Sequence, residues 1–93
     1  MSYFLITFAN THTAISTQKF LTGKINFCIM PTLRELSQSC GVSIRINLTE
    51  LDETQTLQEM AYPIIKLMDS QSVSSNLYQL YYIQDNQITP IPS

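Results

Sequence analysis

A polar segment from Pro31 to Gly41 is the feature that most limits how this chain can fold. It reads PTLRELSQSCG and separates two apolar, strand-like runs, INFCIM before it and VSIRINL after it. A connection that only reverses the chain needs about two to five residues. This one is longer, carries helical signals of its own, and ends with a thiol beside a glycine. We therefore expect the functional information in the sequence to be concentrated here.

Strand-like and helical patterns alternate along the rest of the chain. Apolar runs with β-branched and aromatic residues predict four strands, at Tyr3 to Ala9, Ile25 to Met30, Val42 to Leu48 and Leu77 to Ile83. Capping residues and helical spacing predict three helices: one from the Asn10–Thr13 cap region to about Thr22, a short one over Thr32–Gln38, and one that Asp52 caps and Pro63 kinks or interrupts.

This order favours an α+β fold over residues 1–83. Two right-handed strand-helix-strand units in one four-stranded antiparallel sheet give a ferredoxin-like βαβ(α)βαβ sandwich. A small doubly wound α/β sheet is the alternative, although the middle helix is short for a crossover. The segment 84–93 carries two prolines and lacks periodicity, so we expect a flexible C-terminal tail.

Composition excludes several classes of function. Seven acidic and five scattered basic residues leave a net charge of −2, which disfavours nucleic acid as a partner. The apolar N-terminal run is too short to span a membrane and has no basic leader, so the expected location is cytoplasmic. Two cysteines and one histidine are too few for a closed zinc site. We predict neither a metal nor another cofactor.

Cys40 is the residue that most suggests covalent chemistry. A thiol becomes nucleophilic when it is partly exposed and close to positive charge or helix-terminal amides. In the predicted fold, His12 and Arg34 lie at the same rim and can supply that charge. At the end of its own short helix, however, Cys40 meets the negative end of the helix dipole. The alternative is a small apolar side chain packed behind the Gly41 cap.

The other candidate residues have ordinary structural interpretations beside functional ones. Cys28, in the middle of a strand, is expected to be a buried structural thiol. Asn10 to Thr13 can bind an anion at a helix N-terminus or act only as caps. The acidic cluster Glu50, Asp52 and Glu53 suits a helix N-terminus better than a metal site.

One face of the predicted sheet lacks helices. We expect it to hold Tyr3, Leu5, Cys28, Met30 and tyrosines of the last strand. An apolar face of this kind usually marks a protein partner, and a second copy of the chain is the simplest one. The alternative is that the segment from Gln84 folds over it.

Two stretches, YFLITFANTHTAI and IMPTLRELSQSCGVSIRI, resemble the small bacterial family of selenium/sulfur carrier protein-like proteins. Its members carry a T-H pair before a helix and a P-T-P-R…S-C-G motif before a strand. The matching positions are Thr11, His12, Pro31, Thr32, Arg34, Glu35, Leu36, Ser37, Ser39, Cys40 and Gly41. Leu33 departs from the pattern, where the family has a second proline.

The resemblance implies that Cys40 carries sulfur or selenium as a persulfide or selenosulfide. Thr11, His12, Arg34, Ser39 and Gly41 would support the thiolate. The partners would be a donor and an acceptor protein, which makes the chain a carrier or accessory protein more than a turnover enzyme. The alternative is a non-catalytic module that binds a small anion or a protein at the same rim.

Overall fold

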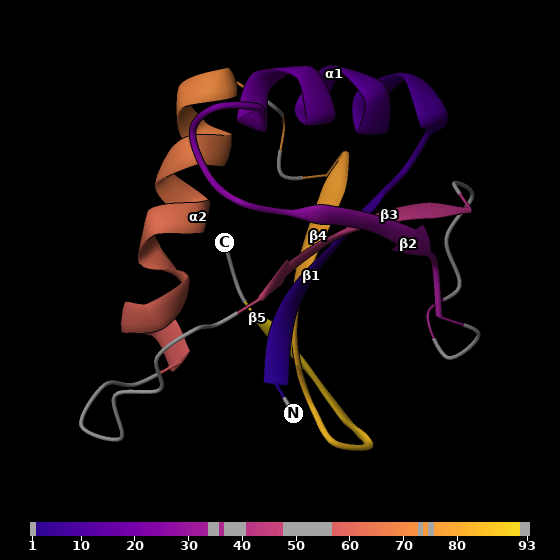
Figure 1. Ribbon diagram of the computed structural model, residues 1–93, viewed down its shortest axis with the longest axis vertical. Helices are drawn as coiled ribbons and strands as arrows, with labels where there is room; N and C mark the ends of the chain where they lie inside the picture. The colour runs from indigo at the N-terminus through magenta and orange to yellow at the C-terminus, as the bar shows by residue number, and fades with distance from the viewer. Residues whose placement is uncertain are drawn as a thin grey trace.

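The computed structural model describes residues 2–33, 36, 41–47, 57–72, 74 and 76–91. In these ranges the elements are β1 (Ser2–Phe8), α1 (Thr11–Leu21), β2 (Cys28–Pro31), β3 (Val42–Asn47), α2 (Leu57–Gln71), β4 (Tyr78–Gln84) and β5 (Gln87–Ile91) (Figure 1). The order confirms the mixed α+β class. The predicted short helix over 32–38 and the Asp52 cap lie largely outside the described residues.

The sheet has five strands in the order β2-β3-β1-β4-β5. Every strand pair is antiparallel, so the doubly wound alternative, which needs parallel strands, is wrong. The predicted count of four strands is also wrong, because β5 adds a fifth at the edge beside β4. Both helices contribute to one apolar core with the strands, and they lie together on one side of the sheet (Figure 1).

Strand β5 replaces the flexible tail that the two prolines suggested. It pairs with β4 from Gln84↔Gln87 to Leu80↔Ile91, across a two-residue turn at Asp85 and Asn86. Asp85 has a φ of 53°, in the left-handed region that such short hairpin turns require. Pro90 is tolerated because β5 is an edge strand, where one side of the backbone needs no partner.

Alternation along β1 builds the core. Phe4, Ile6 and Phe8 are fully buried and point to the helices. Their partners on the same side come from every other described element except β2: Ala14 and Leu21, Ile44 and Ile46, Ala61, Ile64 and Met68, Tyr78, Leu80 and Tyr82, and Ile91. On α1, Ile15 is 46% exposed, whereas Thr13 and Thr17 are buried.

The two helices begin and end as local chemistry dictates, with one exception. Asn10, in the predicted cap region, caps α1, and Gly23 follows the end of the helix with a φ of 85°, a conformation that favours glycine. Helix α2 continues through Pro63, whose ring lies on the exposed side of the helix, and ends only at Gln71. The predicted interruption at Pro63 is therefore wrong, because packing of Ala61, Ile64 and Met68 holds both halves of α2 against the core.

The sheet face without helices is not open in its middle. The register places Leu5 beside Arg45 and Tyr81, and Cys28 beside Arg45, which confirms that these residues share a face. Leu5 has no exposed surface. The segment after Gln84 extends the sheet and does not fold over this face. No helix in the described ranges has the length and apolar character needed to cross a membrane.

Candidate functional site

Four segments lie together at one end of the strands, which we call the rim. They are Asn10–Thr13, Pro31–Thr32, Gly41–Val42 and Leu77. The pairs Ile6↔Ile44 and Pro31↔Val42 bring the end of β1 and the end of β2 to the start of β3. The Ala9 amide donates to the Leu77 carbonyl at 2.9 Å. Figure 1 shows the start of α1, the end of β2 and the start of β3 on the same side of the molecule. The topology predicts this arrangement, and the register bears it out.

A pair of hydrogen bonds closes the base of the β2–β3 connection. The Thr32 amide donates to the Gly41 carbonyl at 3.0 Å, which continues the strand ladder by one step. The Thr32 and Ser43 hydroxyls lie 2.8 Å apart and share a hydrogen bond. The Leu36 amide donates to the Leu33 carbonyl at 3.0 Å. The connection is therefore an anchored hairpin loop, while Arg34, Ser39 and Cys40 lie outside the described residues.

The start of α1 presents two of the predicted residues to solvent at the rim. Asn10 Oδ1 accepts hydrogen bonds from the Thr13 amide and the Thr13 hydroxyl, both at 2.8 Å. This bond makes Asn10 the cap and leaves Thr11 and His12 exposed in the first turn. Gly41, also exposed, lies at the same rim. The structure thus places Thr11, His12 and Gly41 at the rim.

Cys28 is an exposed free thiol, and the prediction of a buried one is wrong. Its strand is short and lies at the edge of the sheet, so neighbours flank it on one side only. On the helix-free face it stands beside Arg45, its register partner in β3. The apolar run INFCIM is typical of a strand but does not tell an edge strand from a central one. The protein therefore presents a thiol that sequence reasoning had assigned to the core.

Buried hydroxyl groups line the helix-free face next to the rim. Ser43 has no exposed surface, and its hydroxyl shares a hydrogen bond with Thr32, the residue that follows β2. Thr7 is equally buried, pairs with Gln79 in the sheet register, and its Oγ1 has no hydrogen-bond partner. An unpaired buried hydroxyl costs about 1–3 kcal/mol of folding free energy. This part of the sheet is therefore more polar than its apolar flanks predict.

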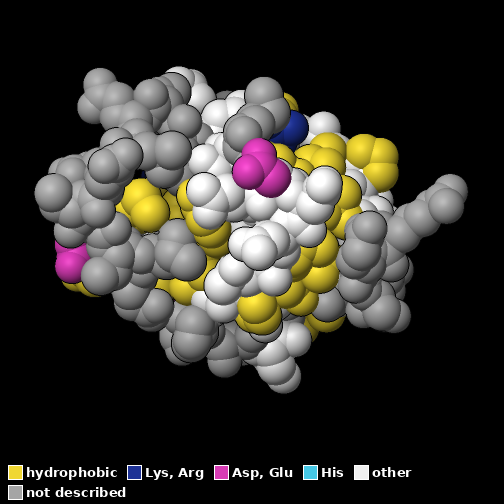
Figure 2. Space-filling view, turned by 90° about the horizontal axis from the view of Figure 1, so that it is seen from below, with side chains coloured by type: hydrophobic (Ala, Val, Ile, Leu, Met, Phe, Trp, Pro, Cys, Tyr) yellow, Lys and Arg dark blue, Asp and Glu magenta, His cyan; other side chains and the backbone are white. Residues whose placement is uncertain are grey.

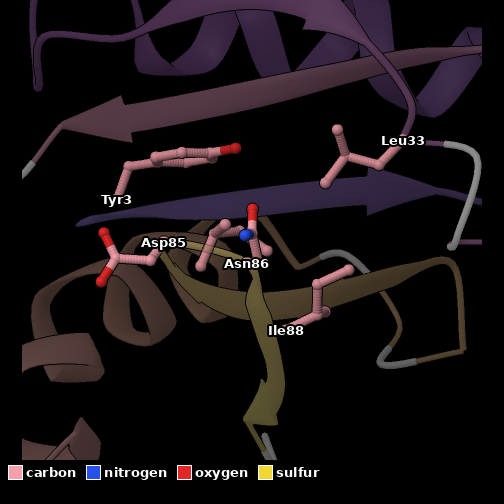
Figure 3. Close-up of a pocket in the computed structure, with 6 residues that line it drawn as sticks. Tyr3, Leu33, Asp85, Asn86 and Ile88 are labelled. Carbon is pink, nitrogen blue, oxygen red and sulfur yellow. The ribbon is translucent and has the colours of Figure 1, made fainter. Parts of the chain in front are cut away.

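A hollow of about 320 Å³ lies on the helix-free face. It is lined by Tyr3, Leu33, Ile83, Asp85, Asn86 and Ile88. In Figure 3 the Tyr3 hydroxyl and the Asn86 carboxamide point toward its middle, between Leu33 and Ile88. The Arg45 guanidinium stacks 4.0 Å from the centre of the Tyr3 ring and donates to Asn47 Oδ1 at 2.7 Å, which fixes that ring.

Sequence reasoning missed this hollow because it treated the segment after Gln84 as a tail. The available signal was the Asp85-Asn86 pair between Ile83 and Ile88, a turn flanked by strand-forming residues. Seen from the end with the N-terminus and the β4–β5 turn, apolar atoms cover a broad area of the described surface and charged side chains are few (Figure 2). Leu33 joins the hollow to the anchored loop.

The described residues hold no group of three or more metal-ligating side chains. The acidic cluster Glu50, Asp52 and Glu53 lies outside them. The prediction that these carboxylates serve a helix N-terminus therefore stays a prediction.

The fold and the rim define a small mixed α+β domain. In it, the anchored hairpin loop and the first turn of α1 both lie at the rim. The chain belongs to the family described as "Putative Se/S carrier protein-like", whose model matches residues 3–67. The match confirms the resemblance and extends beyond the two motifs into α2. Comparisons with curated proteins and with solved structures found no match.

Proposed function

We propose that this protein is a sulfur or selenium carrier that uses the thiol of Cys40. Its family is named for that role. The observation that carries the proposal is the hydrogen bond from the Thr32 amide to the Gly41 carbonyl at 3.0 Å. This bond ties the loop that contains Cys40 to the rim where α1 begins. Cys40 directly precedes Gly41 in the chain.

The proposed chemistry is thiol exchange without an external oxidant. The Cys40 thiolate attacks the outer sulfur of a persulfide on the donor protein, and the donor thiolate leaves. Cys40 then holds the persulfide until a nucleophile on the acceptor attacks the terminal sulfur and releases the Cys40 thiolate. A selenosulfide would follow the same exchange, with selenium as the outer atom. The carrier returns to its starting state after each transfer.

Residues at the rim would keep Cys40 in its reactive, deprotonated form. His12 and Arg34 would supply positive charge, and the Thr11 and Ser39 hydroxyls would supply hydrogen bonds. Thr11 and His12 support this proposal because both are exposed in the first turn of α1, where free amides favour an anion. Gly41 ends the loop with a backbone that its neighbours do not crowd.

The strand order also supports a finer statement about the fold. Without β5, the order β2-β3-β1-β4 and the two strand-helix-strand units match the ferredoxin-like arrangement. We propose that this arrangement is the parent of the sheet and that β5 was added at its edge.

Intact-mass measurement tests the carrier function. The protein is incubated with a cysteine desulfurase and cysteine, without reductant, and the mass of an added sulfur atom is sought. We expect the adduct in the wild type and in Cys28→Ser, and its loss in Cys40→Ser. The Cys28→Ser control is essential because Cys28 is exposed and can react on its own. An adduct that survives in Cys40→Ser and disappears in Cys28→Ser would overturn the assignment to Cys40.

A further inference from the structure

A second hollow, of about 440 Å³, lies between helix α2 and the connection that follows α1. It is lined by Lys24, Ile25, Pro63, Lys66, Leu67 and Ser70. Figure 1 shows the connection curving past α2 on its way to β2. Helix α1 is roughly 16 Å long, and this hollow lies near its C-terminal end. The rim lies at the other end of α1, so the two sites are separate.

The walls of this hollow are apolar. The four residues from α2 recur at the spacing i, i+3, i+4 and i+7, which places them on one side of the helix. Leu67 is half-buried and packs against the core, as Ile25 does from the opposite wall. The Pro63 ring adds a third apolar surface and has no amide hydrogen to offer. An apolar body of a few carbon atoms can therefore fill the space between them.

Two lysines bring positive charge to these apolar walls. The Lys24 ammonium donates to the Phe20 carbonyl at 3.0 Å and lies 4.4 Å from the centre of the Phe20 ring, so its position is fixed. The Lys66 ammonium lies 5.8 Å from the centre of the Tyr62 ring. No carboxylate stands among the described residues that line the hollow. Asp69, three residues after Lys66 on α2, does not line the hollow.

This concentration of positive charge runs against the composition of the chain. Acidic residues outnumber basic ones by seven to five, yet two of the five basic residues line one hollow. The hydroxyl of Ser70 lies one turn after Lys66 on the same side of α2 and adds a neutral donor. Apolar walls with a few convergent polar groups are what small-molecule sites present, and the volume falls within their range of about 300–1,000 Å³.

We propose that this hollow binds a small amphipathic anion. The apolar body lies against Ile25, Pro63 and Leu67, and a carboxylate or similar head group lies between the ammonium groups of Lys24 and Lys66. The site does not depend on Cys40, so it goes beyond the carrier function. Its ligand class is set by the two charges and the apolar walls together: an inorganic anion lacks the body, and an alkylamine has the wrong charge.

An amide-resolved NMR titration with hexanoate tests the proposal, with hexylamine as the probe of equal chain length and opposite charge. We expect hexanoate to shift the amide signals of Ile25, Lys66 and Leu67, and hexylamine to leave them unchanged. Lys66→Met keeps an unbranched apolar side chain one atom shorter than that of lysine and removes one charge-assisted contact. It should weaken hexanoate binding by about tenfold, since such a contact is worth at least about 1.4 kcal/mol.

Lys19→Met is the matched control. Lys19 is an exposed lysine in the last turn of α1 and does not line the hollow, so the change in net charge is the same. We expect hexanoate binding to be unchanged in Lys19→Met and in Cys40→Ser. Equal binding of hexylamine, or equal weakening by Lys19→Met and Lys66→Met, would overturn the proposal. Loss of hexanoate binding in Cys40→Ser would also overturn it, because the site would then belong to the rim.

Discussion

The two edge strands of the sheet differ in what they contribute to the core. Strand β2 is exposed: Ile29, on the side of the helices, is 47% accessible, and Cys28 on the other side is a free thiol. Strand β5 ends at Ile91, which is 2% accessible and belongs to the core. Ile91 belongs to the same buried cluster as Ile64 and Met68 of α2, whereas no residue of β2 belongs to it.

The difference separates stability from function in this small chain. Strand β5 adds Ile91 to the core at one edge of the sheet. Strand β2 contributes no residue to the buried cluster, and its end carries the anchored loop of the rim. A chain of this size has little stability to spare. We infer that the edge formed by β2 serves the site, and that the edge formed by β5 supplies, through Ile91, stability that the site itself does not.

Truncating the buried isoleucine gives the largest expected effect. Ile91→Ala removes a side chain from the core, so the free energy of unfolding should fall by about 2–5 kcal/mol. Ile29→Ala is the matched change on the other edge, and we expect a loss within about 0.5 kcal/mol. Urea denaturation followed by circular dichroism measures both. Equal losses would remove the distinction between the two edges.

Breaking the base of the loop should have an intermediate effect. Ser43→Ala leaves the Thr32 hydroxyl without its 2.8 Å partner, and we expect a loss of about 1–2 kcal/mol in the free energy of unfolding. The double variant Ser43→Ala, Thr32→Val should cost less than the sum of the two single changes, because the hydroxyls form one interaction. Strict additivity in the denaturation curves would show that the bond contributes nothing.

Relieving the hairpin turn on the other edge should raise stability. Asp85 holds a φ of 53°, which glycine adopts without steric cost. Asp85→Gly should increase the free energy of unfolding by up to about 1 kcal/mol. The thermal midpoint by calorimetry checks this, with Asp69→Gly on α2 as a control that should be destabilising. A lower midpoint for Asp85→Gly would mean that the Asp85 carboxylate contributes more than its backbone strain costs.

The smallest effect on stability is expected at the exposed thiol. Cys28→Ser should change the free energy of unfolding by less than about 0.5 kcal/mol, because the side chain lies at the surface. Native Cys28 should nevertheless react with iodoacetamide without denaturant, and peptide mapping would locate the label. Labelling that requires urea would show that Cys28 is shielded in the native protein and that the β2 edge is less open than its described neighbours suggest.

The parts of the fold that local patterns control could be predicted. The alternation over Val42 to Leu48 predicted β3, and the cap region Asn10–Thr13 predicted where α1 begins, since capping and side-chain period act within a few residues. The meeting of Thr11 and His12 with Gly41 at the rim followed from strand order. These predictions needed no knowledge of burial.

The parts that depend on neighbours distant in sequence could not be predicted. Cys28 has the flanks of a core residue, and only the position of β2 at the edge of the sheet exposes it. Pro90 argues against a strand until β5 is known to lie at the opposite edge, where proline is allowed. The hollow between Tyr3 and Asn86 depends on the second of these, because the β4–β5 turn and β5 line part of it. The burial of a residue depends on where its strand lies in the assembled sheet, and that place is set by all of the strand pairings together.

Pro31 has a consequence for how copies of this protein meet one another. The Thr32 amide points inward to Gly41, so the nitrogen of Pro31, one residue earlier, faces away from β3 toward solvent. That nitrogen carries no hydrogen. A strand from another molecule that approached β2 would find no donor at this position, and one step of a fibril-like ladder could not form. Pro31 therefore also disfavours edge-to-edge pairing of β2 with a strand from another molecule.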